Sequence, residues 1–328
     1  MTGAAGFIPV LHAATQSRPD EIDTIVAAQS VAGALARLGY TTGLIGLARD
    51  LGGLEALPAR RPLLVFNLVD AVGGDCRLAA MVPARLDTLA IHYTGARTSA
   101  WLDTLSKIGT KLRLAHAGLP TPDWSQDGTG FDPDARVIVK PVWEHGSLGI
   151  DPASVTRGAD AARAIVERTL RWRTEHFAER YIDGRELAIA MIEQPHGVEV
   201  LPISETLFHG FGEGEPLITD YDAKWTPGSQ PYVGTPRRFG LEKDAPELAA
   251  ELTRLALACW ELFNLDGYAR VDFRVGRTGA PFILEVNMNP CLSADAGFAA
   301  SALEAGIDYD AMIARVIQAS LGRLQATA

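Results

Sequence analysis

Apolar residues in the first hundred positions alternate between strand-like and helix-like spacing. Three runs have the length and the apolar content of buried strands: residues 7–11, 41–47 and 63–69. After the first run, apolar side chains recur every three or four positions from Glu21 to Gly39, which predicts a helix that ends at the glycine. Strands that alternate with helices predict a parallel sheet. Ligands of such sheets bind beyond the carboxyl ends of the strands, here near residues 12–16 and 67–75.

The middle of the chain predicts further helices and strands. Residues 98–117 have the spacing of one helix, and the turn-rich stretch that follows marks a domain boundary. Beyond it, the pattern predicts a strand at 136–142 and a helix at 159–172. Two strand-like runs, 177–182 and 185–192, flank the Asp183-Gly184 pair, and this two-residue turn signal predicts a β-hairpin.

The last third of the chain contains a long irregular stretch followed by clearly patterned elements. Residues 195–240 are rich in glycine, proline and aromatic residues, and within them 218–236 has the character of a mobile loop. Long loops in compact domains are often active-site lids, so Lys224 is a candidate for contact with a ligand, with solvent exposure as the ordinary alternative. The later pattern predicts helices at 245–262 and 309–321 and strands at 269–275 and 281–288.

The last two predicted strands form a hairpin with one polar face. Side chains alternate along a strand, so Arg270 and Asp272 share one face, and Glu285 and Asn287 share a face of the partner strand. If the two polar faces match, two carboxylates and an amide oxygen meet beside Arg270. Hard oxygen ligands of this kind suit Mg²⁺, which usually binds together with substrate phosphates. A hairpin with one solvated face would show the same alternation.

A second candidate site lies on the strand predicted at 136–142. Lys140 stands there among apolar residues, directly before a loop that contains Gly146, Ser147 and Gly149. A lysine beside small residues is a common way to hold nucleotide phosphates, because backbone N–H groups surround the oxygens and the ammonium neutralises them. An edge-strand lysine beside an ordinary turn is the alternative.

Two glutamates lie near the Asp183-Gly184 turn. Glu179 precedes it and Glu186 follows it, and solvent exposure is the ordinary fate of both. In a nucleotide site they could instead accept hydrogen bonds from an adenine amino group or from ribose hydroxyls.

Composition and charge narrow the classes of function. The 328-residue chain is 47% hydrophobic and 21% charged, which is typical of a soluble globular protein with room for two or three domains. A formal net charge of −10 argues against a nucleic-acid-binding protein. Cys76, Cys259 and Cys291 lack paired or metal-ligand spacing, which indicates a reducing compartment. No apolar run could span a membrane and the N-terminus lacks the positive region of a signal peptide, so we expect a cytoplasmic protein without membrane or nucleic-acid partners.

Four separated motifs carry a resemblance to a known family. In chain order they are VIVKPVWEHGSLGI, AERYIDGRELAIAMI, YDAKW, and ARVDFRV followed by FILEVNMNP. In this order the chain resembles the ATP-grasp superfamily, and most closely the D-alanine–D-alanine ligase family, over roughly residues 60–315. The resemblance implies an α/β protein in which two α+β subdomains sandwich ATP, and family analogy suggests a homodimer. The implied domains are an N-terminal parallel α/β domain (1–97), a central ATP-grasp subdomain (98–192) and a C-terminal subdomain with the metal and catalytic site (193–328).

The resemblance also implies a set of nucleotide contacts. Lysines contact the phosphates, a glycine-rich loop closes over them, and a later segment holds adenine and ribose. The corresponding residues are Lys111 and Lys140 for the phosphates, Ser147 and Gly149 in the loop, Glu179, Arg180 and Ile182 for adenine, and Glu186 for ribose. Lys224 corresponds to a phosphate-binding lysine of the family's flexible loop.

The implied metal and catalytic residues come from the C-terminal hairpin. Asp272, Glu285 and Asn287 correspond to the ligands of two magnesium ions, with Mn²⁺ as a substitute, and Glu285 corresponds to the ligand that can bridge them. Arg270 corresponds to the arginine that stabilises the tetrahedral intermediate. The implied chemistry is activation of a carboxylate by ATP to an acyl phosphate, which an amine then captures with loss of phosphate.

The resemblance weakens where the amino-acid substrates are expected. The family's glycine pair after the first strand is His12-Ala13-Ala14 here, and Glu21 is the nearest candidate for the glutamate that holds the first amine. Val69-Asp70 replaces a His-Gly pair after the third strand. Cys291 replaces a glycine whose N–H helps to bind the second substrate, and Ala296 replaces a serine that contacts the carboxylate of that substrate.

These departures lead us to expect an ATP-dependent carboxylate–amine ligase that forms a dipeptide-type amide bond from small amino-acid substrates, which need not be two D-alanines. Two alternatives remain open at this point. One is an ATP-grasp kinase that transfers phosphate to a small molecule. The other is a non-catalytic nucleotide-binding regulator.

Overall fold

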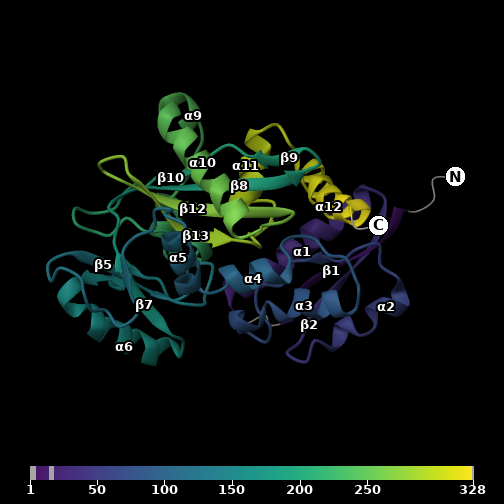
Figure 1. Ribbon diagram of the computed structural model, residues 1–328, viewed down its shortest axis with the longest axis horizontal. Helices are drawn as coiled ribbons and strands as arrows, with labels where there is room; N and C mark the ends of the chain where they lie inside the picture. Colours follow the sequence, from purple (N-terminus) through teal and green to yellow (C-terminus); the bar gives the residue numbers. More distant parts are fainter. Residues whose placement is uncertain (1–4, 15–17, 327–328) are drawn as a thin grey trace.

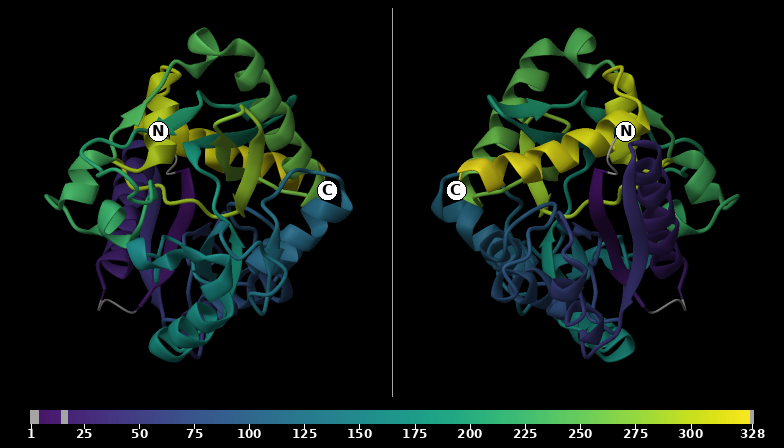
Figure 2. Two further views of the ribbon diagram at one scale, coloured as in Figure 1. Left: turned by 90° about the vertical axis from the view of Figure 1, so that its left-hand side faces the viewer. Right: turned by 90° about the vertical axis from the view of Figure 1, so that its right-hand side faces the viewer.

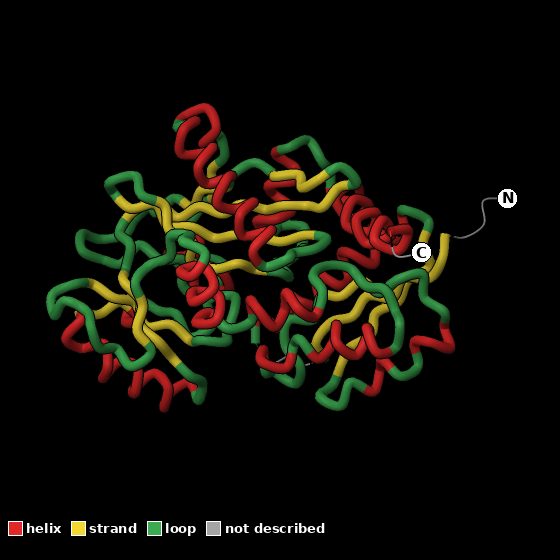
Figure 3. The backbone as a smooth tube through the Cα atoms, in the orientation of Figure 1, coloured by secondary structure: helices red, strands yellow, loops and turns green. Residues whose placement is uncertain are grey.

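The computed structural model describes residues 5–14 and 18–326. Its strands form a parallel sheet of three strands and two mainly antiparallel sheets of six and four strands, and helices flank them (Figures 1 and 3). The predicted α/β class with three structural units is therefore confirmed. No helix in these described ranges is both long and apolar enough to cross a membrane.

The N-terminal unit is built on the parallel sheet, whose strand order is β2-β1-β3. Its elements are β1 (Ala5–Ala13), α1 (Pro19–Arg37), β2 (Tyr40–Leu47), α2 (Leu57–Arg60), β3 (Phe66–Asn67) and α3 (Met81–Thr88). The strand expected at 63–69 is regular only over two residues, because Val65 makes an isolated bridge to Tyr93 instead of continuing the ladder. The ligand position expected at 12–16 lies partly outside the described residues, which omit Thr15 and Gln16.

The helix predicted at residues 98–117 is divided in two. Residues 98–117 form two helices, α4 (Thr98–Thr104) and α5 (Lys107–His116), where the apolar spacing predicted one. Ser106 interrupts the pattern, because its hydroxyl accepts a hydrogen bond from the N–H of Gly109 (3.2 Å) and so caps a new helix.

The four-stranded sheet carries the lysine strand. Its strand order is β4-β7-β5-β6, and α6 packs against β5 and β7. The elements are β4 (Trp124–Ser125), β5 (Arg136–Pro141), β6 (Val155–Arg157), α6 (Ala161–Trp172) and β7 (His176–Arg180). The strand and helix predicted in this region are both confirmed.

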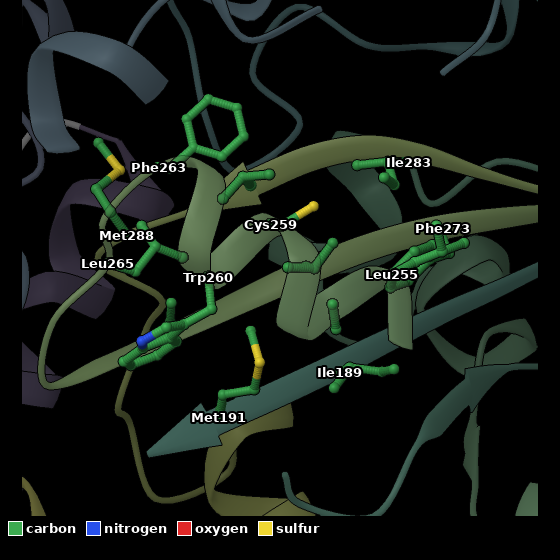
Figure 4. Packing of buried hydrophobic residues seen from close by; sticks show 14 of the residues in the cluster. Ile189, Met191, Leu255, Cys259, Trp260, Phe263, Leu265, Phe273, Ile283 and Met288 are labelled. Atoms are coloured by element: carbon green, nitrogen blue, oxygen red, sulfur yellow. The ribbon is translucent and has the colours of Figure 1, made fainter. Parts of the chain in front are cut away.

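The six-stranded sheet has the order β11-β10-β8-β12-β13, with β9 paired to β8. Its strands are β8 (Gly184–Gln194), β9 (Gly197–Val200), β10 (Ser204–Thr206), β11 (Arg237–Arg238), β12 (Tyr268–Gly276) and β13 (Pro281–Asn287). The hairpin of β12 and β13 is confirmed. One face of this sheet is covered by α10 (Pro246–Leu262), which follows the short α9 (Leu241–Asp244). Figure 4 shows Leu255, Cys259 and Trp260 of α10 packed against Met191 and Phe273 of the strands.

The hairpin predicted across Asp183-Gly184 is wrong. The two segments are strands, but β7 belongs to the four-stranded sheet and β8 to the six-stranded one. The chain therefore passes from one sheet to the other at this turn. Gly184 suits the passage because a Cβ there would lie 2.0 Å from the carbonyl oxygen of Val275, closer than any side chain tolerates. The predicted domain limit after residue 192 falls inside β8, so we propose a limit at 183/184 instead.

The stretch expected to be an irregular lid contains two short helices. They are α7 (Tyr221–Trp225) and α8 (Gln230–Gly234). Asp220 and Ser229 cap them, and each accepts a hydrogen bond from the backbone N–H three residues on. Apolar periodicity over longer windows does not detect such short helices.

The C-terminal helices fasten the N-terminal unit to the six-stranded sheet. They are α11 (Gly297–Glu304) and α12 (Tyr309–Ala326), and α12 contacts both α1 and β8 (Figure 2). One continuous apolar cluster joins Val31 of α1, Tyr268 of β12 and Ile313 of α12. The polar face of the six-stranded sheet is thereby held against the N-terminal unit.

Candidate functional site

The register of the six-stranded sheet brings the predicted polar residues together. Asp272 lies directly opposite Glu285, and Arg270 lies opposite Asn287. Residues directly opposite each other in a sheet share a face, so all four point to the same side. The condition set from the sequence, that the polar faces of the two strands match, is met.

Each carboxylate of this group has a basic partner. The guanidinium of Arg270 donates two hydrogen bonds to Asp272, of 2.6 and 2.8 Å. Glu285 is in contact with the imidazole of His145, from the loop that follows β5. Burial alone would raise the pKa of Glu285, but the positive charge of Lys107 and the hydrogen bond with His145 hold that pKa well below its ordinary value. The carboxylate is therefore ionised at neutral pH.

This group fits a hard cation. It offers two carboxylates and an amide oxygen on neighbouring strands, which is the ligand chemistry of Mg²⁺. Within the described residues no cluster of three or more His, Cys, Asp or Glu side chains has metal-binding geometry, so the amide of Asn287 and ligands from outside the protein would complete the coordination. Water and phosphate oxygens usually fill those positions around Mg²⁺.

Lys111, Lys140 and Glu179 form one buried ion cluster. Lys111 and Glu179 are each 1% exposed, and the ammonium nitrogen of Lys111 lies 2.6 Å from a carboxylate oxygen of Glu179. Lys140, which is 15% exposed, contacts the other carboxylate oxygen. Burial lowers the pKa of Lys111, whereas the two lysines lower the pKa of Glu179 against the effect of burial.

A hydroxyl connects this ion cluster to β13. Lys111 donates to the hydroxyl of Thr121 (2.8 Å), which in turn donates to the carbonyl oxygen of Ile283 on β13 (2.9 Å). The lysines predicted to contact phosphates are thus tied to the strand that carries Glu285.

The loop after β5 is joined to the lid segment by two hydrogen bonds. Ser147 donates from its hydroxyl to the carbonyl oxygen of Thr219 (2.7 Å), and Trp225 donates from its indole to the carbonyl oxygen of Gly146 (2.7 Å). Gly149 has a φ of +71°, which favours glycine at this turn. The predicted glycine-rich loop and the predicted lid therefore lie against each other.

Lys224 stands near the end of α7, close to the carboxylates. It forms no ion pair within the described ranges. Burial and the positive charge of Arg270 lower its pKa, while Asp272 and Glu285 act in the opposite direction. A cation in this position is available to an anionic ligand.

The residues expected at the adenine and ribose lie at the junction of the two antiparallel sheets. Arg180 lies over the ring of Phe282 at 5.0 Å from its centroid, and Ile182 is buried. Glu186 forms an ion pair of 2.9 Å with Arg274, which lowers the pKa of Glu186 although burial opposes it. These side chains surround the strand passage between the sheets.

The two expected substrate residues lie near the start of α1. The carboxylate of Glu21 accepts a hydrogen bond from the backbone N–H of Arg18 (3.2 Å) and lies 3.3 Å from its guanidinium. The thiol of Cys291 donates to Asp23 (3.0 Å), and burial raises the pKa of Cys291 to about 12. The thiol stays protonated at neutral pH, which agrees with its interpretation as a small non-nucleophilic side chain.

The sequence did not single out several polar residues of the site. His145 contacts Glu285, Arg274 pairs with Glu186, and the phenol of Tyr221 donates to Asp20 (2.8 Å). Side chains that alternate along β12 put Arg274 on the face of Arg270, so that residue could have been found from the sequence. His145 and Tyr221 reach the site only because the loop and the lid fold over it.

The comparison with protein families decides the identity of the fold and its chemistry. The family model described as "D-ala D-ala ligase C-terminus" matches residues 134–318, more than half of the chain. The chain belongs to the D-alanine–D-alanine ligase family. The resemblance drawn from the four motifs is thereby confirmed.

Individual relatives of this ligase family agree over most of the chain. The D-alanine–D-alanine ligase of Methylococcus capsulatus is 30% identical over 84% of this chain and 84% of its own length. That of Moorella thermoacetica is 29% identical over 89% and 92%. An uncharacterized protein of Sinorhizobium fredii is 32% identical over 87% and 84%.

A solved structure shows the same architecture. D-alanine–D-alanine ligase from Bacillus anthracis, complexed with ATP, superposes with a TM-score of 0.76 at 21% identity, over 99% of this chain and all of that one. The ATP-grasp fold is therefore confirmed. With the relatives, family membership makes the protein an ATP-dependent carbon–nitrogen ligase of the D-alanine–D-alanine ligase type, and nothing supports the kinase or the regulator.

Proposed function

We propose that the protein joins the carboxylate of one amino acid to the amine of a second, with cleavage of ATP to ADP and phosphate and with Mg²⁺ as the metal. The observation that carries this proposal is the strand register that sets Asp272, Glu285 and Asn287 beside Arg270. Lys224, which lacks an ion pair in the described chain, supplies a further positive charge to the same place.

Asp272, Glu285 and Asn287 are the residues that would hold the metal. Bound Mg²⁺ would neutralise phosphate charge and orient the transferred phosphoryl group. The contact of Glu285 with His145 and that of Asp272 with Arg270 orient both carboxylates. Glu285, at the centre of the group, is our candidate for the ligand shared by two ions.

The ion cluster provides the positive charge for the nucleotide. Lys140 reaches solvent and is assigned to the phosphates, together with Ser147 and Gly149 of the adjoining loop. Lys111 is assigned to the phosphates as well. Because it is buried against Glu179, we assign it a second role, which is to orient Glu179 toward the adenine. Arg180, Ile182 and Glu186 complete the adenine and ribose contacts.

The chemical step requires activation of a carboxylate. Hydroxide is a poor leaving group, so ATP converts the carboxylate to an acyl phosphate, and attack by the amine then expels phosphate. Arg270 stabilises the oxyanion that develops during this attack, because its guanidinium is fixed on the same face as the metal ligands. Lys224 and the lid exclude water from the acyl phosphate, which would otherwise hydrolyse.

The relatives named above are D-alanine–D-alanine ligases, and D-alanine is therefore the first substrate to test. Two positions argue for a different second substrate. Cys291 adds a side chain where the family has glycine, and Ala296 lacks the hydroxyl of the family's serine. Glu21 remains the candidate partner of the first amine, and the homodimer remains a prediction from family analogy.

A phosphate-release screen tests the ligase proposal. The protein is incubated with ATP, Mg²⁺ and D- or L-amino acids, singly and in pairs, and products are identified by mass spectrometry. We expect ADP and phosphate in equal amounts, accompanied by a dipeptide. A phosphorylated amino acid without free phosphate would indicate a kinase, and ADP at background with every pair would indicate a binding protein.

Two substitutions test the site assignment within the same assay. Glu285→Ala removes the proposed shared ligand and should abolish turnover without loss of folding by circular dichroism. Glu251→Ala is the matched control, because Glu251 is exposed on α10 and pairs only with Arg254 among the residues the structure describes. Full activity of Glu285→Ala would refute the metal site.

A further inference from the structure

The edge strand β11 places two adjacent arginines on opposite faces of the six-stranded sheet. Arg237 lies opposite Thr206, which lies opposite Glu186, which lies opposite Arg274 of β12. This row shares the face of Arg270, which lies four residues before Arg274 on β12. Arg237 therefore projects from the edge of the sheet onto the catalytic face.

Arg238 belongs to the other face and has carboxylate partners there. It lies opposite Glu205 in the ladder and pairs with that carboxylate at 2.8 Å. The guanidinium of Arg238 also lies 3.2 Å from the carboxylate of Asp244. Glu205 forms a second ion pair, of 2.6 Å, with Arg185. The role of Arg238 is thus accounted for by the fold.

Arg237 has no such carboxylate partner within residues 18–326. Its guanidinium donates one hydrogen bond, of 3.1 Å, to the backbone carbonyl oxygen of Asp295. Arg237 is an exposed residue of β11, and partial desolvation together with the nearby positive charge of Arg270 lowers its pKa, against smaller opposite effects from Asp295, Tyr232 and Cys291. Two guanidinium groups thus face one region in which an anion would stabilise both.

The segment after β13 leaves room for this arginine. A Cβ at Gly297 would lie 3.3 Å from Nε of Arg237, so the guanidinium occupies the space that a side chain at 297 would need. The same segment contains Cys291, whose thiol bonds to Asp23 of α1. Arg237 therefore lies on the sheet face of Arg270, next to the segment that follows β13.

We propose that Arg237 is a specificity-determining residue of this chain that binds a carboxylate of the amine-donating substrate. The inference rests on the proposed ligase function. The carboxylate to be activated belongs at the metal ligands and Lys224, so a second anion beyond Arg270 belongs to the attacking molecule. That anion is either the α-carboxylate of an amino acid or the side-chain carboxylate of an acidic one, and Arg237 can pair with either in bidentate fashion.

The test compares acceptors with and without each carboxylate. D-Alanine is the activated substrate. The acceptors are D- and L-alanine, aspartate and glutamate, each as the free acid and as the α-carboxamide. The α-carboxamides have no α-carboxylate to activate and are used as acceptors only. Products are separated by mass. We expect the wild type to prefer acceptors that retain a carboxylate by about 10- to 100-fold in kcat/KM, the effect of one charge-assisted contact.

Substitution of the arginine should remove that preference selectively. Arg237→Met should raise the acceptor KM about 10- to 100-fold, with the KM for ATP unchanged and with carboxamide acceptors unaffected. Arg237→Lys should restore part of the preference, because it keeps the charge but not the paired donors. The matched control is Arg254→Met, on the exposed surface of α10.

The outcomes separate this inference from the ligase proposal. If the wild type discriminates against every α-carboxamide and Arg237→Met does not, Arg237 binds the α-carboxylate. If the wild type still uses the α-carboxamides of aspartate and glutamate, Arg237 binds a side-chain carboxylate. An active enzyme in which Arg237→Met leaves the acceptor KM and the acid preference unchanged overturns the inference and leaves the ligase proposal standing. No ADP release with any acceptor overturns both.

Discussion

At the scale of single residues, some cations of the site have a carboxylate partner among the described residues and others do not. Lys111 is buried and neutralised by Glu179, so its charge is already compensated in the fold. Lys224 and Arg237 each lie near the positive charge of Arg270, and neither has a carboxylate ion pair in the part of the chain that the structure describes. Cations held near one another without partners cost stability, and a bound anion relieves that cost. We therefore expect both to act on ligands rather than on the fold.

The pH dependence of ATP use should report the protonation state of Lys224. Its pKa is lowered from the ordinary 10.5 by burial and by Arg270, so the ammonium deprotonates below pH 10.5 as pH rises. We expect kcat/KM for ATP, which reflects the free enzyme, to fall on the alkaline side below that pH. Lys224→Arg should move the fall to higher pH, since arginine stays charged. An unchanged alkaline limb in Lys224→Arg would contradict a charged role for this residue.

At the scale of elements, the passage between the two antiparallel sheets is the point that sequence patterns describe least well. The Asp183-Gly184 pair has the composition of a hairpin turn, and both flanking segments are strands. These two strands do not pair with each other because β8 pairs with β12 instead, over nine residues from Gly184 to Ile192. Pairing of β7 with β4 and β5 then completes the other sheet.

Gly184 should be intolerant of any side chain. Gly184→Ala places a Cβ 2.0 Å from the carbonyl oxygen of Val275, so β8 and β12 must separate at that end. We expect a loss of more than about 2 kcal/mol in the free energy of unfolding, measured by urea denaturation. Gly33→Ala, inside α1, is the control and should be neutral or stabilising by up to about 1 kcal/mol, because only the flexible end of Arg37 is near. Equal stability of the two variants would show that β8 adapts.

At the scale of the whole molecule, the site lies where the three sheets meet. The N-terminal unit is joined to the six-stranded sheet through α12, and the lid is joined to the loop of the four-stranded sheet through Ser147 and Trp225. A nucleotide bound at this junction would contact several units at once. Its binding free energy would then stabilise their relative arrangement.

Nucleotide and metal should therefore raise the thermal stability together. At 100 times the dissociation constant, a non-hydrolysable ATP analogue with Mg²⁺ should add about 2.7 kcal/mol. That corresponds to a rise in Tm of roughly 5 °C, measured by differential scanning fluorimetry. The analogue with EDTA should give a smaller rise, and Glu285→Gln should reduce the Mg²⁺-dependent part. A shift that is equal with Mg²⁺ and EDTA would contradict the proposed metal ligands.

Much of the architecture could be predicted because it follows from local periodicity. The parallel N-terminal sheet, the strand of Lys140 and the hairpin of β12 and β13 each carry their own apolar pattern, and alternation alone put Asp272 and Arg270 on one face. The break between α4 and α5 was missed because a single capping serine, Ser106, outweighs continuous apolar spacing. Short elements such as α7 were missed because one helical turn is too brief to show a period.

The sequence by itself determined which residue types stand on which face of each strand, because side chains alternate strictly along an extended backbone. It thereby defined the proposed metal-binding group and, through the order of four motifs, the family. Only the tertiary structure decided which segments pair across long distances in the chain, since pairing depends on competition among all strands at once. That competition separated β7 from β8, brought His145 to Glu285, and set Arg237 on the catalytic face while its neighbour Arg238 faces away.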